Sequence, residues 1–198
     1  MTASKTFNGV WRNRIEQTKQ QVESKWIGRS GVSFAHLPGC AKLEPQVEQA
    51  MKKVCTGKVC EVGCGTGRIS NYFRPNRYIG LDINHESLAV AEKRNPKYEF
   101  DLIMWEALYP TADTYLFFTV MMHIPDGEIF HIVKKLFNRV VIIESMGRWL
   151  RDYGKGNNYQ RDPFEYRELF KQIGMKEVEL THCLASHYPY YLDVMVFE

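Results

Sequence analysis

Three glycines at alternate positions follow a short apolar segment, and an acidic residue stands two positions before the first of them. The stretch reads Glu61-Val62-Gly63-Cys64-Gly65-Thr66-Gly67. Glycines in such a turn let the backbone approach a ligand closely and adopt positive φ. A dinucleotide-binding turn would have its third glycine at position 68, which is arginine here, and Glu61 would repel a phosphate. The pattern therefore favours a ligand with a cationic head, such as a sulfonium that carries an α-amino group.

A second acidic residue, Asp82, ends the next predicted strand and lies nineteen residues after Gly63 (82 minus 63). An acid about 20 residues beyond a glycine turn can accept hydrogen bonds from both hydroxyls of a ribose. Taken singly, the glycine turn is an ordinary strand-to-helix connection and Asp82 is a helix cap. Their order and spacing together predict a site for a nucleoside.

A histidine follows the most apolar predicted strand. His123 belongs to the stretch from Thr119 to Asp126, at the end of the strand expected over 114–120. A neutral imidazole, with an ordinary pKa of about 6.5, can accept a proton from an attacking hydroxyl. We interpret His123 either as that catalytic base or as a structural cap of the helix expected from about Asp126.

A basic and aromatic segment without helical or strand periodicity covers residues 146–161. Loops longer than about 12–15 residues usually carry function or lack fixed structure. Side chains that would hold an anionic or sugar-like substrate are Arg148, Arg151, Tyr153 and Arg161. Tyr159 is a second catalytic candidate after His123. The alternative is a solvated loop that binds nothing.

These side chains need a scaffold, and the hydrophobic pattern predicts alternating strands and helices. Strands are expected at 58–62, 77–81, 98–103, 114–120 and 139–143. One helix should begin at 45, and residues 69–73 should form the start of a second. Further helices are expected at 86–94, 129–137 and 163–173. Residues 178–183 and 191–197 should pair as an antiparallel hairpin at a sheet edge, because no helix separates them. The sequence thus predicts an α/β fold with a doubly wound, mostly parallel, seven-stranded sheet.

The N-terminal segment differs from the rest. Six basic and two acidic residues give positions 1–30 a local charge of +4, and Trp11, Ile15, Val22 and Trp26 recur at helical spacing. We expect an amphipathic helix over 10–26 within an N-terminal arm of residues 1–44, ahead of a domain of residues 45–198. The helix either packs on the domain or forms a lid over a ligand.

The composition excludes several classes of function. The chain has 198 residues, enough for one α/β domain, and a net charge of +3, too small to indicate binding to nucleic acid or to a membrane surface. No apolar segment is long enough to cross a bilayer. The five cysteines lack zinc-site spacing and the six histidines are scattered, so we expect no metal. Reduced thiols and the absence of a signal peptide predict a cytoplasmic protein.

The glycine segment closely resembles motif I of the class I S-adenosylmethionine-dependent methyltransferases, and residues 78–84 resemble the acidic-loop motif that follows it. The resemblance implies a Rossmann-like methyltransferase fold and S-adenosylmethionine as cofactor. Glu61 would lie near the methionine amino group, Asp82 at the ribose and Ile83 against the adenine. The further cofactor-binding residues would be Gly63, Cys64, Gly65, Gly67, Thr119 and, facing the adenine amino group, Trp105 or Glu106.

The resemblance also implies an activity. We expect transfer of a methyl group to an oxygen or nitrogen of a small, anionic or sugar-like molecule. Two alternatives are an RNA or protein methyltransferase guided by the basic N-terminal arm, and a non-catalytic domain that retains cofactor binding.

Overall fold

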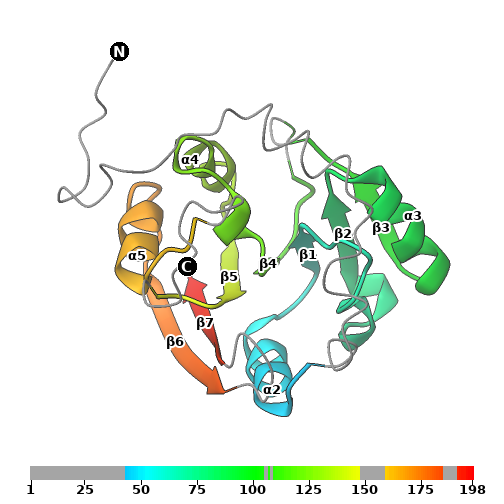
Figure 1. Ribbon diagram of the computed structural model, residues 1–198, viewed down its shortest axis with the longest axis horizontal. Coiled ribbons are helices and arrows are strands. Elements are labelled where there is room, and N and C mark those ends of the chain that lie inside the picture. The colour runs from blue at the N-terminus through cyan, green and yellow to red at the C-terminus, as the bar shows by residue number, and fades with distance from the viewer. Residues whose placement is uncertain (1–42, 105–106, 108, 148–158, 185–190) are drawn as a thin grey trace.

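The computed structural model describes residues 43–104, 107, 109–147, 159–184 and 191–198, and Figure 1 draws the other residues as a thin grey trace. The N-terminal helix expected over 10–26 lies outside the described residues. So does most of the arm assigned to residues 1–44, and that division of the chain stays a prediction.

The described residues build one seven-stranded sheet with the order β3-β2-β1-β4-β5-β7-β6. Its five parallel strands are β1 (Val59–Val62), β2 (Tyr78–Asp82), β3 (Glu99–Leu102), β4 (Thr114–Phe118) and β5 (Arg139–Glu144). The last two strands, β6 (Glu177–Leu184) and β7 (Tyr191–Phe197), are antiparallel, and β7 lies between β5 and β6. The predicted fold class, including the C-terminal hairpin at a sheet edge, is confirmed.

Helices cover both faces of this sheet, as Figure 1 shows. On one face α2 (Pro45–Val54) packs its apolar residues against the sheet. On the other face lie α4 (Asp126–Val133) and α5 (Pro163–Lys171), while α3 (His85–Arg94) contacts β2 and β3. Strand β4 is buried on both sides, because alternate residues enter the two apolar cores. Among the described residues, no helix has the length and apolar character to cross a membrane.

One expected helix is missing. Where we expected a helix from 69–73, the chain forms two short 3₁₀ turns, Ser70–Tyr72 and Pro75–Arg77. Only residues 68–77 separate the glycine turn from β2, and Pro75 lies among them, where it could not donate the backbone hydrogen bond of a helix interior. The glycine turn therefore leads almost directly into the next strand.

The predicted start of α5 is confirmed. The Asp162 side chain accepts from the Glu165 backbone N–H at 2.9 Å, and the Glu165 side chain accepts from the Asp162 N–H at 2.9 Å, which is a capping box. Helix α4 begins at Asp126, as expected, and its N-cap residue is Pro125 and not His123. The parallel strands bring the glycine turn, Asp82 and the residues after β4 and β5 to one edge of the sheet.

Candidate active site

The glycine turn after β1 is shaped by three left-handed residues. Gly63, Gly65 and Gly67 have φ of 80°, 55° and 67°. A Cβ on Gly63 would lie 2.2 Å from a methyl group of Val120, so the turn is packed closely against the segment that follows β4. Around Gly65, by contrast, no heavy atom of the described residues lies within 4 Å of the Cβ position. The turn therefore leaves open space for a ligand beside the half-buried backbone of Gly65.

Other residues of the turn face inward. A Cβ on Gly67 would lie 2.8 Å from the Phe100 ring, which makes Gly67 a packing position. Cys64 is 5% exposed, and its Sγ would be 2.9 Å from a Cβ on Gly80, so its side chain packs on β2. We expected both Cys64 and Gly67 to bind the cofactor. Because the Cys64 side chain faces inward and Gly67 has no side chain, such contacts would be made by their backbone atoms.

Asp82 ties the glycine turn to the end of β2. One of its carboxylate oxygens accepts from the Gly65 N–H at 2.7 Å, and the other accepts from the Asn84 N–H at 2.9 Å. Burial raises the pKa of Asp82, and these N–H donors lower it in part. Each carboxylate oxygen can accept more than one hydrogen bond, so Asp82 retains capacity for ribose hydroxyls. Ile83, the next residue, is half-buried at the same edge.

Glu61 lies within β1 beneath the glycine turn and is 3% exposed. The Tyr78 hydroxyl donates a hydrogen bond to one of its oxygens. Burial raises the pKa of Glu61 to about 8, although the bond from Tyr78 and the charge of Arg68 act in the opposite direction. A buried carboxyl of this kind gains most from a cation that enters beside it, because the cation stabilises its ionised form.

The segment after β4 forms the opposite wall. Thr119 adopts a φ of 55°, rare for a residue with a side chain, and its N–H donates to the Ile143 carbonyl at 2.8 Å. This bend directs the chain across the glycine turn, where Val120 contacts Gly63. The 3₁₀ turn Met121–His123 follows, and its last residue is half-buried. Backbone strain at the end of a strand is common at functional sites.

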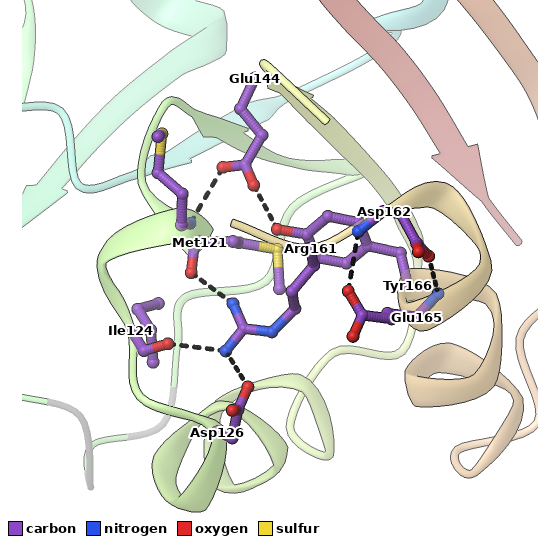
Figure 2. A network of polar contacts seen from close by, with 9 residues as sticks. Met121, Ile124, Asp126, Glu144, Arg161, Asp162, Glu165 and Tyr166 are labelled. Atoms are coloured by element: carbon purple, nitrogen blue, oxygen red, sulfur yellow. Dashed lines mark hydrogen bonds and ion pairs between the residues drawn. The ribbon is translucent and has the colours of Figure 1, made fainter. Parts of the chain in front are cut away.

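A buried polar network holds this turn from below, as Figure 2 shows. One Glu144 oxygen accepts from the Met122 N–H at 3.1 Å, and the other accepts from the Tyr166 hydroxyl. Burial raises the pKa of Glu144 to about 7, while Tyr166 and the Met122 N–H lower it in part. Sequence analysis missed both Glu144 and Tyr166. The sequence held one indication of Glu144. It follows four apolar residues at the end of a strand, where a buried charge without a partner would be costly.

Arg161 belongs to this network. It is 2% exposed, and its guanidinium donates to the carbonyls of Met121 at 2.8 Å and Ile124 at 2.7 Å, and to Asp126 at 2.8 Å. We had interpreted Arg161 as a substrate-binding residue because of the basic segment around it. The guanidinium instead turns inward to bind backbone carbonyls, so its observed contacts are structural.

Tyr159 lies against the same turn. Its N–H donates to the Met122 carbonyl at 2.6 Å, and its side chain is buried. The structure thus brings Tyr159 close to the turn that carries His123. The remaining predicted site residues lie outside the described residues: Trp105, Glu106, Arg148, Arg151 and Tyr153. In the described part of the chain, no group of three or more His, Cys, Asp or Glu side chains could hold a metal ion.

Known proteins share both sequence and fold with this chain. The model of a methyltransferase domain family matches residues 59–141. A trans-aconitate 2-methyltransferase of Sinorhizobium medicae (strain WSM419) is 32% identical over 97 residues, which is 46% of this chain. The match spans only 35% of that enzyme's length.

Two solved structures carry the same fold at low identity. The magnesium protoporphyrin IX methyltransferase of Synechocystis PCC 6803, with S-adenosylhomocysteine bound, has a TM-score of 0.60 and 18% identity over 76% of this chain and 79% of its own. Human N-acetylserotonin methyltransferase, in complex with S-adenosylmethionine, has a TM-score of 0.59 and 16% identity over 77% of this chain and 50% of its own.

The domain match runs from the glycine turn through Asp82 and β4 into β5, the part of the sheet that positions the candidate site. The similarity of fold extends beyond this range, since the Synechocystis structure covers 76% of this chain. Residues 59–141 of this chain therefore match a methyltransferase domain family, and the described residues have the fold of solved methyltransferases that bind S-adenosylmethionine or S-adenosylhomocysteine.

Proposed function

We propose that this protein transfers the methyl group of S-adenosylmethionine to an oxygen or nitrogen of a small organic molecule. The observation that carries the proposal is the pairing of a buried carboxyl, Glu61, with an accessible glycine backbone that Asp82 holds in place. The cofactor, when bound, supplies a methyl group on a sulfonium, which is already activated for transfer.

The residues present fit that cofactor. Glu61 would accept a hydrogen bond from the methionine amino group, and the cation would in turn favour its ionised form. Asp82 would accept hydrogen bonds from the ribose, and the Gly65 backbone would lie against the same part of the ligand. Ile83 follows Asp82 and offers an apolar surface for the adenine.

The acceptor would lie on the other side, against the turn after β4. His123 would take the proton of an attacking hydroxyl there. The competing interpretation, in which His123 caps α4, is weakened because Pro125 is the N-cap residue. Since the sulfonium is a good leaving group, correct positioning of the acceptor would supply much of the rate enhancement.

The names of the relatives support a small-molecule acceptor. They are methyltransferases of trans-aconitate, magnesium protoporphyrin IX and N-acetylserotonin. Their low identity or partial coverage leaves the acceptor of this chain open, so these three compounds serve as probes.

The test is a transfer assay with S-adenosylmethionine labelled in its methyl group. The full-length protein is incubated with each probe, with a low-molecular-weight filtrate of a cell extract, and with added RNA or protein. Label is then measured in the small-molecule, RNA and protein fractions. We expect label in at least one small molecule. Label that enters only added RNA or protein, or none at all, would contradict the proposal.

A further inference from the structure

Gln160 carries a buried oxygen without a partner. The side chain is 3% exposed, and its Oε1 is the only buried side-chain polar atom in the described ranges that lacks a hydrogen bond. Most buried polar groups in folded proteins are paired, because an unpaired one loses its bonds to water without compensation. An orphaned acceptor therefore calls for an explanation.

The residues on both sides of Gln160 are held by hydrogen bonds, which fixes the position from which its side chain extends. On one side the Tyr159 N–H donates to the Met122 carbonyl at 2.6 Å. On the other side Arg161 makes three contacts, to the Met121 and Ile124 carbonyls and to Asp126. Figure 2 shows the Arg161 guanidinium pointing toward this turn. The protein thus maintains the unpaired oxygen at the cost of stability.

The location of Gln160 indicates which molecule could donate a hydrogen bond to its unpaired oxygen. Its neighbours bind the backbone of the turn Met121–His123, at the carboxyl end of β4. Val120, at the start of the same turn, packs on Gly63 of the glycine turn. Gln160 is therefore attached to the wall of the site against which the acceptor would approach the methyl group.

We propose that Gln160 binds the methyl acceptor, with its Oε1 accepting a hydrogen bond from an O–H or N–H group of that molecule. This inference rests on the proposed function and narrows it. A neutral amide oxygen favours acceptors that carry a hydrogen-bond donor. It gives no attraction to a fully ionised carboxylate, which has no hydrogen to donate. An acceptor with a hydroxyl or amide N–H, such as N-acetylserotonin, is favoured over trans-aconitate.

The test compares Gln160→Met with Gln172→Met. Methionine has a similar length and removes the amide at either position. Gln172 caps α5, and its exposed amide donates to the Glu168 carbonyl at 3.2 Å, which makes it a matched control. For each full-length variant we would measure the Tm without ligand, the Kd for S-adenosylhomocysteine, and KM and kcat with the small molecule that the wild type methylates.

We expect Gln160→Met to have an unchanged or higher Tm, because the variant removes an unpaired polar atom. Its Kd for S-adenosylhomocysteine should stay within about twofold of the wild type, and its KM for the acceptor should rise by about tenfold or more, as for a lost substrate hydrogen bond. Gln172→Met should match the wild type in all four quantities. A structural Gln160 would give the opposite signature, with a lower Tm and an unchanged KM.

Three results would overturn the inference. The first is an unchanged KM in Gln160→Met. The second is a Gln160→Met protein that fails to fold or loses affinity for S-adenosylhomocysteine, since the amide would then be structural. The third is a wild type that methylates trans-aconitate alone among the probes. A wild type that methylates no small molecule would instead refute the proposed function.

Discussion

At the scale of single residues, Glu61 shows how burial gives a carboxyl an unusual titration. Its pKa of about 8 in the folded protein exceeds the ordinary value of 4.5, so ionisation of Glu61 opposes folding. The stability that the protonated group contributes is complete below about pH 4.5 and is lost as the pH rises through about 8. Without a cofactor, the buried Glu61 therefore lowers the stability of the folded protein at neutral and alkaline pH.

Glu61→Gln should therefore raise the Tm of the ligand-free protein at pH 8 by several degrees and leave it nearly unchanged at pH 4.5. The same substitution should weaken binding of S-adenosylhomocysteine by about 10- to 150-fold, the scale of a hydrogen bond to a charged group. Thermal unfolding across the pH range and calorimetry measure the two effects. Glu179→Gln is the control. Lys53 lowers the pKa of Glu179, so replacing this carboxylate should not raise the Tm of the protein at pH 8. A lower Tm for Glu61→Gln at pH 8 would contradict this account.

His123 is the second residue whose role can be tested alone. His123→Ala should lower kcat by about 10²- to 10⁴-fold if an oxygen is methylated and His123 is the base. Affinity for S-adenosylhomocysteine should hardly change, because the cofactor residues lie on the other side of the site. The rise of the wild-type rate with pH should disappear in the variant. Near-normal turnover would return His123 to a structural role.

The sequence predicted some residues well and others poorly, and burial explains the difference. Glu61, Gly63 and Asp82 lie on two consecutive strands and the turn after the first, and a sequence pattern can capture such local order. The structural contacts of Arg161 could not be predicted from its sequence neighbours. Its carbonyl partners, on Met121 and Ile124, lie almost forty positions away in the sequence.

At the scale of elements, the turn after β4 depends on the charges buried beneath it. Arg161→Met should destabilise the protein by about 3–5 kcal/mol, because it leaves Glu144 buried without a nearby cation and removes the partner of the partly exposed Asp126. Arg167→Met, on α5, removes an Arg paired with Glu177 at the surface and should cost about 0–1 kcal/mol. Urea unfolding of both variants measures the difference. Equal effects would show that the network adds nothing beyond a surface ion pair.

The elements also show where sequence patterns fail. All seven strands were expected within a few residues of their observed bounds, since apolar runs and turn residues mark them clearly. The helix expected after the glycine turn is absent, because chain length and Pro75 outweigh the apolar character of residues 69–73. Pro75 leaves only residues 68–74 ahead of it for such a helix, which is shorter than any α-helix of the described residues.

At the scale of the whole molecule, the described residues, which begin at Leu43, build a seven-stranded sheet with an apolar core on each face. Deletion of residues 1–30 should therefore leave a folded domain. If the helix expected over 10–26 is a lid, the shortened protein should bind S-adenosylhomocysteine more weakly by about tenfold or more, because water would reach the ligand. Circular dichroism checks the fold, and calorimetry measures the affinity. Unchanged affinity would assign the helix to a structural role.

The central claim is that the edge formed by the glycine turn, Glu61 and Asp82 binds a sulfonium nucleoside. Calorimetry of the wild type with S-adenosylhomocysteine and with NAD, repeated with Asp82→Ala, tests it most directly. The account predicts binding of S-adenosylhomocysteine, no measurable binding of NAD, and a loss of about 10- to 150-fold in affinity for Asp82→Ala. Binding of NAD without binding of S-adenosylhomocysteine would contradict it.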